Sequence, residues 1–186
     1  MSLIVIVIMV IVVFAFVSIY NSLIRLKNQI DRAWSNIEVI LKQRFDEIPQ
    51  LIQVIEQYVT YENRILSKLI EARKNYTSAS TVKDKIESSA AATQAFGGLL
   101  ALGESYPELK SNENFKQLQG RISDLENQLS DRRESYNEAA TNFNTRIEQI
   151  PDVIVARTLN YASRELFKVT EEEKKKPLIK INLPTG

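Results

Sequence analysis

The most distinctive pattern in the sequence is an uninterrupted apolar run near its beginning. Residues 3–17 contain no polar side chain, and Ser18, Ile19 and Tyr20 extend the run to an aromatic residue of the kind found at membrane interfaces. As a helix, the seventeen residues 3–19 would span about 26 Å, close to the ~30 Å hydrocarbon core of a bilayer. We therefore expect an uncleaved transmembrane anchor at residues 1–20. The alternative, a cleaved signal peptide, needs basic residues before the run and a small-residue cleavage site, and the run has neither.

Beyond the anchor, apolar residues recur at alternating steps of three and four, which is the spacing of one helix face. The first of these bands follows the anchor without a break. We expect its helix to end between Phe45 and Pro49, because Asp46 can cap a following helix and a proline fits its first turn. The remaining helices are expected over residues 51–76, 82–102, 113–149 and 152–168. Polar connections separate them at 77–81 and 103–112.

These segments predict an all-α fold: a single N-terminal transmembrane helix that continues into an elongated antiparallel helical bundle. The bundle has four main helices plus a short C-terminal helix. The expected organisation is the anchor at 1–20, the bundle domain at 21–168 and a charged and extended C-terminal tail at 169–186. Within the tail, residues 178–183 are β-prone. They form either a frayed end or an extended segment docked in a groove of this domain or a neighbouring one.

The helix expected at 113–149 carries two neighbouring stripes. Its apolar seam, which includes Tyr136, repeats over five heptads and predicts coiled-coil-like packing. Beside it lies a second stripe at steps of three and four: Glu126, Ser130, Arg133, Asn137, Ala140 and Asn144. One interpretation is a solvated flank; the other is a buried or half-buried ladder of hydrogen bonds that sets the register between helices. In the second case, Asp31 and Glu62 are the candidate acidic partners of Arg133.

Three further positions carry specific expectations. Trp34 is the only tryptophan and lies beside the apolar band, so it is interpreted as a core anchor, with a partner-binding hot spot as the alternative. Gly97-Gly98 predicts a kink or a point of close packing inside its helix. Asn112 is placed to cap the helix that follows it.

The amino-acid composition excludes several classes of function. Lys plus Arg is 24 and Asp plus Glu is 23, so there is no electrostatic footprint for nucleic acid. The absence of cysteine and histidine excludes disulfides, zinc sites, Ser/His or Cys/His nucleophile pairs and di-iron centres built on Glu-x-x-His. Gly97-Gly98 lacks the spacing and the lysine of a phosphate-binding loop. We therefore expect no enzyme, no cofactor and no metal; acid–base chemistry by carboxylates, lysine or tyrosine is the remaining enzymatic route.

Charge next to the anchor predicts its orientation. Arg25, Lys27 and Arg32 lie just after the apolar run, and only the α-amino group lies before it. Because positive residues are retained in the cytoplasm, the N-terminus is expected outside and the domain inside. The predicted location is the cell membrane, with a single pass.

The order of the motifs resembles one known family over about residues 20–168. The matching residues are Tyr20-Asn21-x-Leu23, Asp31-x-Ala33-Trp34-x-x-Ile37-x-Val39-x-Leu41-Lys42-x-Arg44, Asp46-x-Ile48-Pro49, Tyr106-Pro107-x-Leu109-Lys110, Asn112-Glu113-Asn114-Phe115, Arg133-x-x-Tyr136-Asn137 and Phe143-Asn144. On these residues the chain resembles the LemA family. That resemblance implies a single-pass membrane protein with a cytoplasmic all-helical domain and no established catalytic activity. Some members of that family act in membrane remodelling or organelle formation, and others are encoded near membrane proteases; this context does not assign the chain a role.

Two functional hypotheses follow. The first is a membrane-anchored, non-enzymatic scaffold that organises protein assemblies or membrane at the cytoplasmic face. The second is a regulatory adaptor for a membrane protease or transporter. The expected partners are the membrane, other copies of the same chain and an unknown protein partner, but no nucleic acid. Self-association is expected because each helix carries an apolar band wider than a four-helix bundle covers, and because copies held in one membrane meet at high effective concentration.

Overall fold

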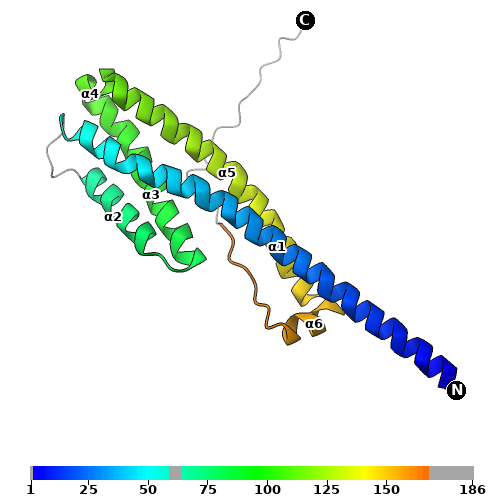
Figure 1. Cartoon of the computed structure of the whole chain (residues 1–186). Helices are drawn as coiled ribbons and strands as arrows, with labels where there is room; N and C mark the ends of the chain where they lie inside the picture. The colour runs from blue at the N-terminus through cyan, green and yellow to red at the C-terminus, as the bar shows by residue number, and fades with distance from the viewer. Residues whose placement is uncertain (1, 59–63, 168–186) are drawn as a thin grey trace, which may run out of the picture.

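The computed structural model describes residues 2–58 and 64–167. In order, its helices are α1 (Ser2–Ile55), α2 (Arg64–Ser78), α3 (Val82–Ser105), α4 (Pro107–Ser111), α5 (Glu113–Glu148) and α6 (Asp152–Thr158). No strand occurs among the described residues. The predicted all-α fold, with one long apolar N-terminal helix that continues into a bundle, is confirmed (Figure 1).

Helix α1 is one unbroken rod that projects far beyond the bundle at its N-terminal end (Figure 1). Residues 2–18 are exposed along their whole length, and Ile19 is the first residue of α1 that packs against the core. This exposed part is the one helix segment in the described chain that is long and apolar enough to cross a membrane. The bundle therefore begins where the apolar run ends, without a linker between them.

The predicted end of the first helix at Phe45 to Pro49 is wrong, because α1 continues through Pro49 to Ile55. A proline inside a helix removes one backbone hydrogen bond and costs about 3 kcal/mol. Leu51 and Ile55, which lie beyond the proline, are both buried on the core face. Each buried side chain of this size contributes about 1.5–3 kcal/mol, so packing of the extra turns offsets the loss. Pro49 itself faces solvent.

Helices α1 and α5 form the long antiparallel pair of the bundle. Arg44 of α1 pairs with Glu126 of α5, and Glu47 of α1 pairs with Arg121 of α5. Residue numbers therefore fall along α5 in the direction in which they rise along α1. The hairpin of α2 and α3 packs against the half of this pair that lies farther from the N-terminus of α1 (Figure 1). The core is a continuous apolar cluster along both pairs; among its fully buried members are Leu23, Ile37, Leu41, Ile48, Leu69, Leu129 and Phe143.

The connections differ from expectation in two places. Helix α2 begins at Arg64, not near residue 51, because the residues up to Ile55 belong to α1. The expected loop at 103–112 is mostly helical: α3 continues to Ser105, and Pro107 opens the short helix α4, where its missing N–H costs nothing.

Two local predictions about these helices are confirmed. The Asn112 side chain accepts a hydrogen bond of 3.0 Å from the Phe115 amide and caps α5. Gly98 is a point of close packing, since a Cβ there would lie 3.3 Å from the side chain of Ile65.

The predicted extent of the last helix, residues 152–168, is also wrong. Helix α6 ends at Thr158, and Asn160 has a left-handed backbone with φ of 51°. The Tyr161 amide then donates to the Ala156 carbonyl at 3.0 Å, and the Asn160 amide donates to that of Arg157 at 3.2 Å. These two bonds are the usual termination of a helix at a left-handed asparagine or glycine. Residues 161–167 leave α6 in a non-helical segment, here called the return segment. The β-prone stretch at 178–183 lies outside the described residues.

Candidate functional site

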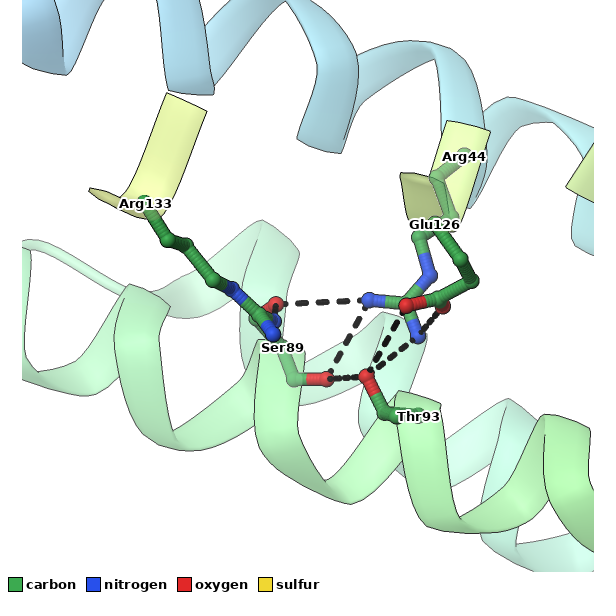
Figure 2. Close-up of polar contacts among 5 residues, drawn as sticks. All are labelled: Arg44, Ser89, Thr93, Glu126 and Arg133. Carbon is green, nitrogen blue, oxygen red and sulfur yellow. Dashed lines mark hydrogen bonds and ion pairs between the residues drawn. The ribbon is translucent and has the colours of Figure 1, made fainter. Parts of the chain in front are cut away.

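The candidate site is a polar network between α1, α3 and α5, in the middle of an otherwise apolar core (Figure 2). Arg44 of α1 is at its centre, and its side chain is completely buried. The guanidinium forms an ion pair with the Glu126 carboxylate of α5. It also lies 4.8 Å from the centre of the Phe96 ring of α3, a distance at which a cation is attracted to the ring.

Helix α3 supplies the hydroxyl and carbonyl groups of the network. Arg44 Nη1 donates to the Ser89 carbonyl at 3.2 Å and to Ser89 Oγ at 3.3 Å, and its Nη2 donates to Thr93 Oγ1 at 2.8 Å. From α5, Arg133 Nη2 donates to the same Ser89 Oγ at 2.9 Å. Thr93 Oγ1 lies 3.4 Å from the Glu126 carboxylate. One serine hydroxyl thus accepts from two arginines on two different helices (Figure 2).

The electrostatics favour a fixed charge pair. Burial lowers the pKa of Arg44 from its ordinary value to about 10; the Glu126 carboxylate opposes this shift and the Arg133 guanidinium adds to it. With a pKa of about 10, Arg44 stays protonated at neutral pH. The hydroxyls of the network therefore lie beside guanidinium groups, which donate hydrogen bonds and do not take up a proton. This chemistry suits a structural role, holding three helices in register.

Two asparagines of α5 hold the return segment. Asn137 Nδ2 donates to the Phe167 carbonyl and the Phe167 amide donates to Asn137 Oδ1, both at 2.9 Å. Asn144 binds the backbone of Arg164 in the same way, at 2.9 and 2.7 Å. Each side-chain amide satisfies one backbone N–H and one carbonyl, as a neighbouring strand would.

An aromatic cluster lies beside these asparagines. The Trp34 ring of α1 packs edge-on against the ring of Tyr136 of α5, with 5.8 Å between ring centres. It lies nearly parallel to the ring of Phe167 in the return segment, with 6.2 Å between ring centres. The Tyr136 hydroxyl donates to the Glu165 carbonyl at 3.0 Å. Burial raises the pKa of Tyr136; Arg164 opposes the shift, and Glu165 and Asp31 add to it. The cluster joins α1, α5 and the return segment.

The predicted stripe on α5 is divided between these environments. Glu126 and Arg133 belong to the polar network, Asn137 and Asn144 hold the return segment, Ala140 is fully buried in the core and Ser130 is exposed. Of the expected acidic partners of Arg133, Asp31 pairs with Lys27 instead, and Glu62 lies outside the described residues. Arg133 also lies 5.2 Å from the centre of the Phe167 ring.

Arg44 is named above only among the residues of the family resemblance, and no role was predicted for it, for Ser89 or for Thr93. A signal for Arg44 was present: Leu41, Arg44 and Ile48 are spaced three and four apart, which places the arginine on the buried face of its helix. Ser89 and Thr93 are four residues apart on an alanine-rich helix and show no comparable signal.

Two surface grooves in the part of the chain that the structure describes are lined by residues outside the polar network. No group of three or more Asp or Glu side chains there is arranged to hold a metal ion. A surface groove of about 380 Å³ between α1 and α5 is lined mainly by glutamine and asparagine, together with Val54, Leu118 and Arg121. A second groove of about 350 Å³, near the α2–α3 connection, contains a single carboxylate, that of Asp46. Neither groove gathers the paired carboxylates that acid–base catalysis would require.

The chain matches one family model and several known proteins over most of its length. The family model described as LemA family matches residues 33–181. The chain is 28% identical over 162 residues to Protein LemA from Metamycoplasma hominis, an alignment that covers 87% of this chain and 74% of that protein. It is 23% identical over 175 residues to Magnetosome protein MamQ 2 from Paramagnetospirillum magneticum, and 21% identical over 174 residues to Magnetosome protein MamQ from Magnetospirillum gryphiswaldense. These two alignments cover 80% of this chain and 64%, just under two thirds, of each relative.

Proposed function

This chain belongs to the LemA family, and from that membership and its geometry we propose that it is a membrane-anchored, non-enzymatic helical scaffold that organises protein assemblies or membrane at the cytoplasmic face. Two of the reported relatives are named as magnetosome proteins, and none of the three is named as an enzyme.

The observation that carries the proposal is the continuity of α1. Its apolar segment has a mean hydropathy of 3.3 and is entirely uncovered by the rest of the described chain. The same helix carries Trp34 and Arg44, to which α5, α3 and the return segment attach. An anchor that continues directly into the core holds the bundle at a set distance and angle from the bilayer. This rigidity is useful to a scaffold that positions other molecules.

The proposed orientation places the bundle in the cytoplasm. The exposed residues Arg25 and Arg32 follow the apolar segment, and positive residues at this point are retained on the cytoplasmic side. Because the chain has no cysteine, a single cysteine introduced as Val39→Cys gives a clean test. We expect it to react with a membrane-impermeant maleimide only after the cells are opened. Reaction in intact cells would contradict the orientation.

The scaffold role is tested by cross-linking in native membranes. Val39 of α1 and Ile70 of α2 are large apolar side chains with 56% and 47% of their surface exposed, so a photo-reactive residue at either position would report on neighbours. We expect adducts that consist mainly of second copies of this chain, together with several other proteins. A single stoichiometric adduct with a membrane protease or transporter would contradict the scaffold and support a regulatory adaptor.

Self-association is part of the same proposal. Lateral confinement in a membrane raises the effective concentration of the bundles, so weak contacts become significant. We expect the detergent-solubilised chain to sediment as a mixture whose mean mass rises with concentration. A monomer at every concentration would contradict self-association.

A further inference from the structure

Two large apolar side chains are exposed where α5 turns into α6. Ile150, between the two helices, has 86% of its surface exposed, and Ile154 on the outer face of α6 has 62%. They are four residues apart, with the exposed Pro151 between them. On the opposite face of α6, Val155 and Ala156 are buried against the bundle. The short helix is therefore packed on one side and presents Ile154 on the other, and Ile150 is exposed in the turn that precedes the helix.

The register between α1 and α5 gives the height of this face above the anchor. Arg146 Nη2 lies 3.5 Å from Ser22 Oγ, so residue 146 is level with residue 22. The two helices are antiparallel, and α5 continues beyond Arg146 to Glu148, so the turn that holds Ile150 lies further toward the anchor than Ser22. Ile150 is therefore near the level at which the exposed apolar segment of α1 ends. In Figure 1, α6 accordingly lies beside α1 at the membrane-proximal end of the bundle.

We propose that the turn formed by Ile150, Pro151 and Ile154 is a second membrane contact, which inserts into the interfacial layer of the bilayer that α1 crosses. The inference rests on the proposed crossing of the membrane by the N-terminal part of α1. A small apolar face at the height of the headgroups is the kind of surface that partly buries itself at the boundary of the acyl chains. The bundle then touches the bilayer at two points, the α1 exit and this turn.

The surroundings of the turn fit a bilayer surface. Arg157 of α6 is exposed one turn after Ile154, and Arg25 of α1 is exposed one turn after Ser22. The nearest buried carboxylate, that of Asp152, is held by Arg146 Nε at 2.7 Å and is neutralised within the fold. Arg157, which is exposed on the same short helix as Ile154, favours the negatively charged headgroups of a membrane surface, and the exposed carboxylate of Glu148 partly offsets it.

The test uses the full chain in liposomes of phosphatidylcholine and phosphatidylglycerol. Because the chain has no cysteine, an environment-sensitive fluorophore can be attached to one introduced residue at a time. The test positions are Ile150→Cys and Ile154→Cys. Val39→Cys, also on an exposed apolar residue, is the matched control, about 31 Å along α1 from residue 18. Val10→Cys, in the middle of the apolar segment, reports on the anchor itself.

For the probe at 10, quenching is measured with lipids that carry a spin label deep in the acyl chains. For the other probes it is measured with lipids that carry a spin label near the headgroup, compared with quenching by aqueous iodide. We expect the probes at 150 and 154 to be quenched by these lipids at least about twofold more than the probe at 39, as an interfacial location requires. Iodide quenching as strong at 154 as at 39 would overturn the inference. In that case the probe at 10 would still be quenched by lipid if the anchor crosses the membrane. Protection from both quenchers at 154 would also overturn it, because protein would then cover the face. Failure of lipid to quench the probe at 10 would instead refute the anchor.

Discussion

Asn137 of α5 and Phe167 of the return segment exchange two hydrogen bonds of 2.9 Å through the side-chain amide of one and the backbone of the other. Asn144 repeats this exchange with Arg164. The spacing explains the repeat, because seven residues of helix rise about 10.5 Å and three residues of extended chain span about 10 Å. Two turns of α5 therefore match three residues of the segment that runs antiparallel to it.

The first prediction is that these asparagines hold the return segment in place. Asn137→Ala and Asn144→Ala each remove two hydrogen bonds, worth about 1–2 kcal/mol together. Local opening of the segment should then be about 5–30-fold more frequent. Amide hydrogen exchange at Arg164 and Phe167 measures this change directly. Ser130→Ala, an exposed position in the same stripe, is the matched control and should leave exchange unchanged. Equal exchange in all three variants would show that the asparagines do not hold the segment.

Local chemistry in the sequence explains which helix ends could be predicted. Asn112 is followed at once by a regular apolar repeat, so its role as a cap is visible from neighbouring residues alone. Pro49 carries an equally strong local signal, but the burial of Leu51 and Ile55 against the rest of the bundle outweighs it. Asn160 ends α6 through a left-handed backbone, which many asparagines in the chain could adopt; among the described residues, no other asparagine has this backbone.

The candidate site shows the same limit in a different form. The helical spacing of Glu126, Arg133, Asn137 and Asn144 places them on one face of α5, and the structure puts all four in polar contacts with other segments. What each of them contacts depends on which residues of α3 and of the return segment lie opposite. That depends on how the helices pack, and a periodic pattern within one helix does not encode it.

The second prediction uses Trp34 as a reporter of the return segment. Phe167 stacks on the Trp34 ring at 6.2 Å, and it is the part of the segment that shields this half-buried indole. Phe167→Ala should therefore shift the Trp34 fluorescence emission to longer wavelength and lower the free energy of unfolding by about 3 kcal/mol, the usual cost of such a cavity. Leu166→Ala, at the exposed neighbouring position, is the control. An unchanged emission spectrum would contradict the stacking.

The third prediction concerns alkaline pH. Burial raises the pKa of Tyr136 in the folded chain above 10, the ordinary value that it regains on unfolding. Between these two pKa values the unfolded chain loses a proton that the folded chain keeps. The contribution of Tyr136 to stability is thus complete below pH 10 and is lost as the pH rises through the folded pKa. Above pH 10 the wild type should lose stability more steeply than Tyr136→Phe, as urea unfolding at a series of pH values would measure. Parallel curves would exclude this linkage.

The fourth prediction is integral membrane insertion. The thirteen Leu, Ile, Val and Phe side chains of residues 3–17 favour insertion by about 4–8 kcal/mol in total. An alkaline carbonate wash should therefore leave the protein in the membrane pellet. Each arginine at the centre of a spanning helix costs about 2.5–3.5 kcal/mol, so Val10→Arg combined with Ile11→Arg should cancel most of the driving force and release the protein. Recovery of the wild type in the supernatant would contradict the anchor.

The last prediction concerns the buried ion pair of Arg44 and Glu126, whose two members are not equivalent. Arg44 is fully buried, whereas Glu126 retains 24% exposure of its side chain. Glu126→Leu leaves a buried guanidinium without its carboxylate and should cost about 3–5 kcal/mol. Arg44→Met leaves a carboxylate that water can reach, so its cost should be lower. The double variant replaces both charges with apolar groups. Its free energy of unfolding should lie within about 2 kcal/mol of the wild-type value, because apolar replacements of a buried pair are often neutral.

Urea unfolding of the full chain in detergent gives the four free energies of this cycle. The matched control is the pair Lys42–Asp46, which is also an ion pair of α1 but has side chains 75% and 59% exposed. Its coupling energy should be only about 0.3–0.5 kcal/mol. A coupling between Arg44 and Glu126 several times larger is expected, because the pair lies in the core and Ser89 and Thr93 hold its guanidinium in place. A coupling no larger than that of Lys42 and Asp46 would mean that the three helices keep their register without the charge pair.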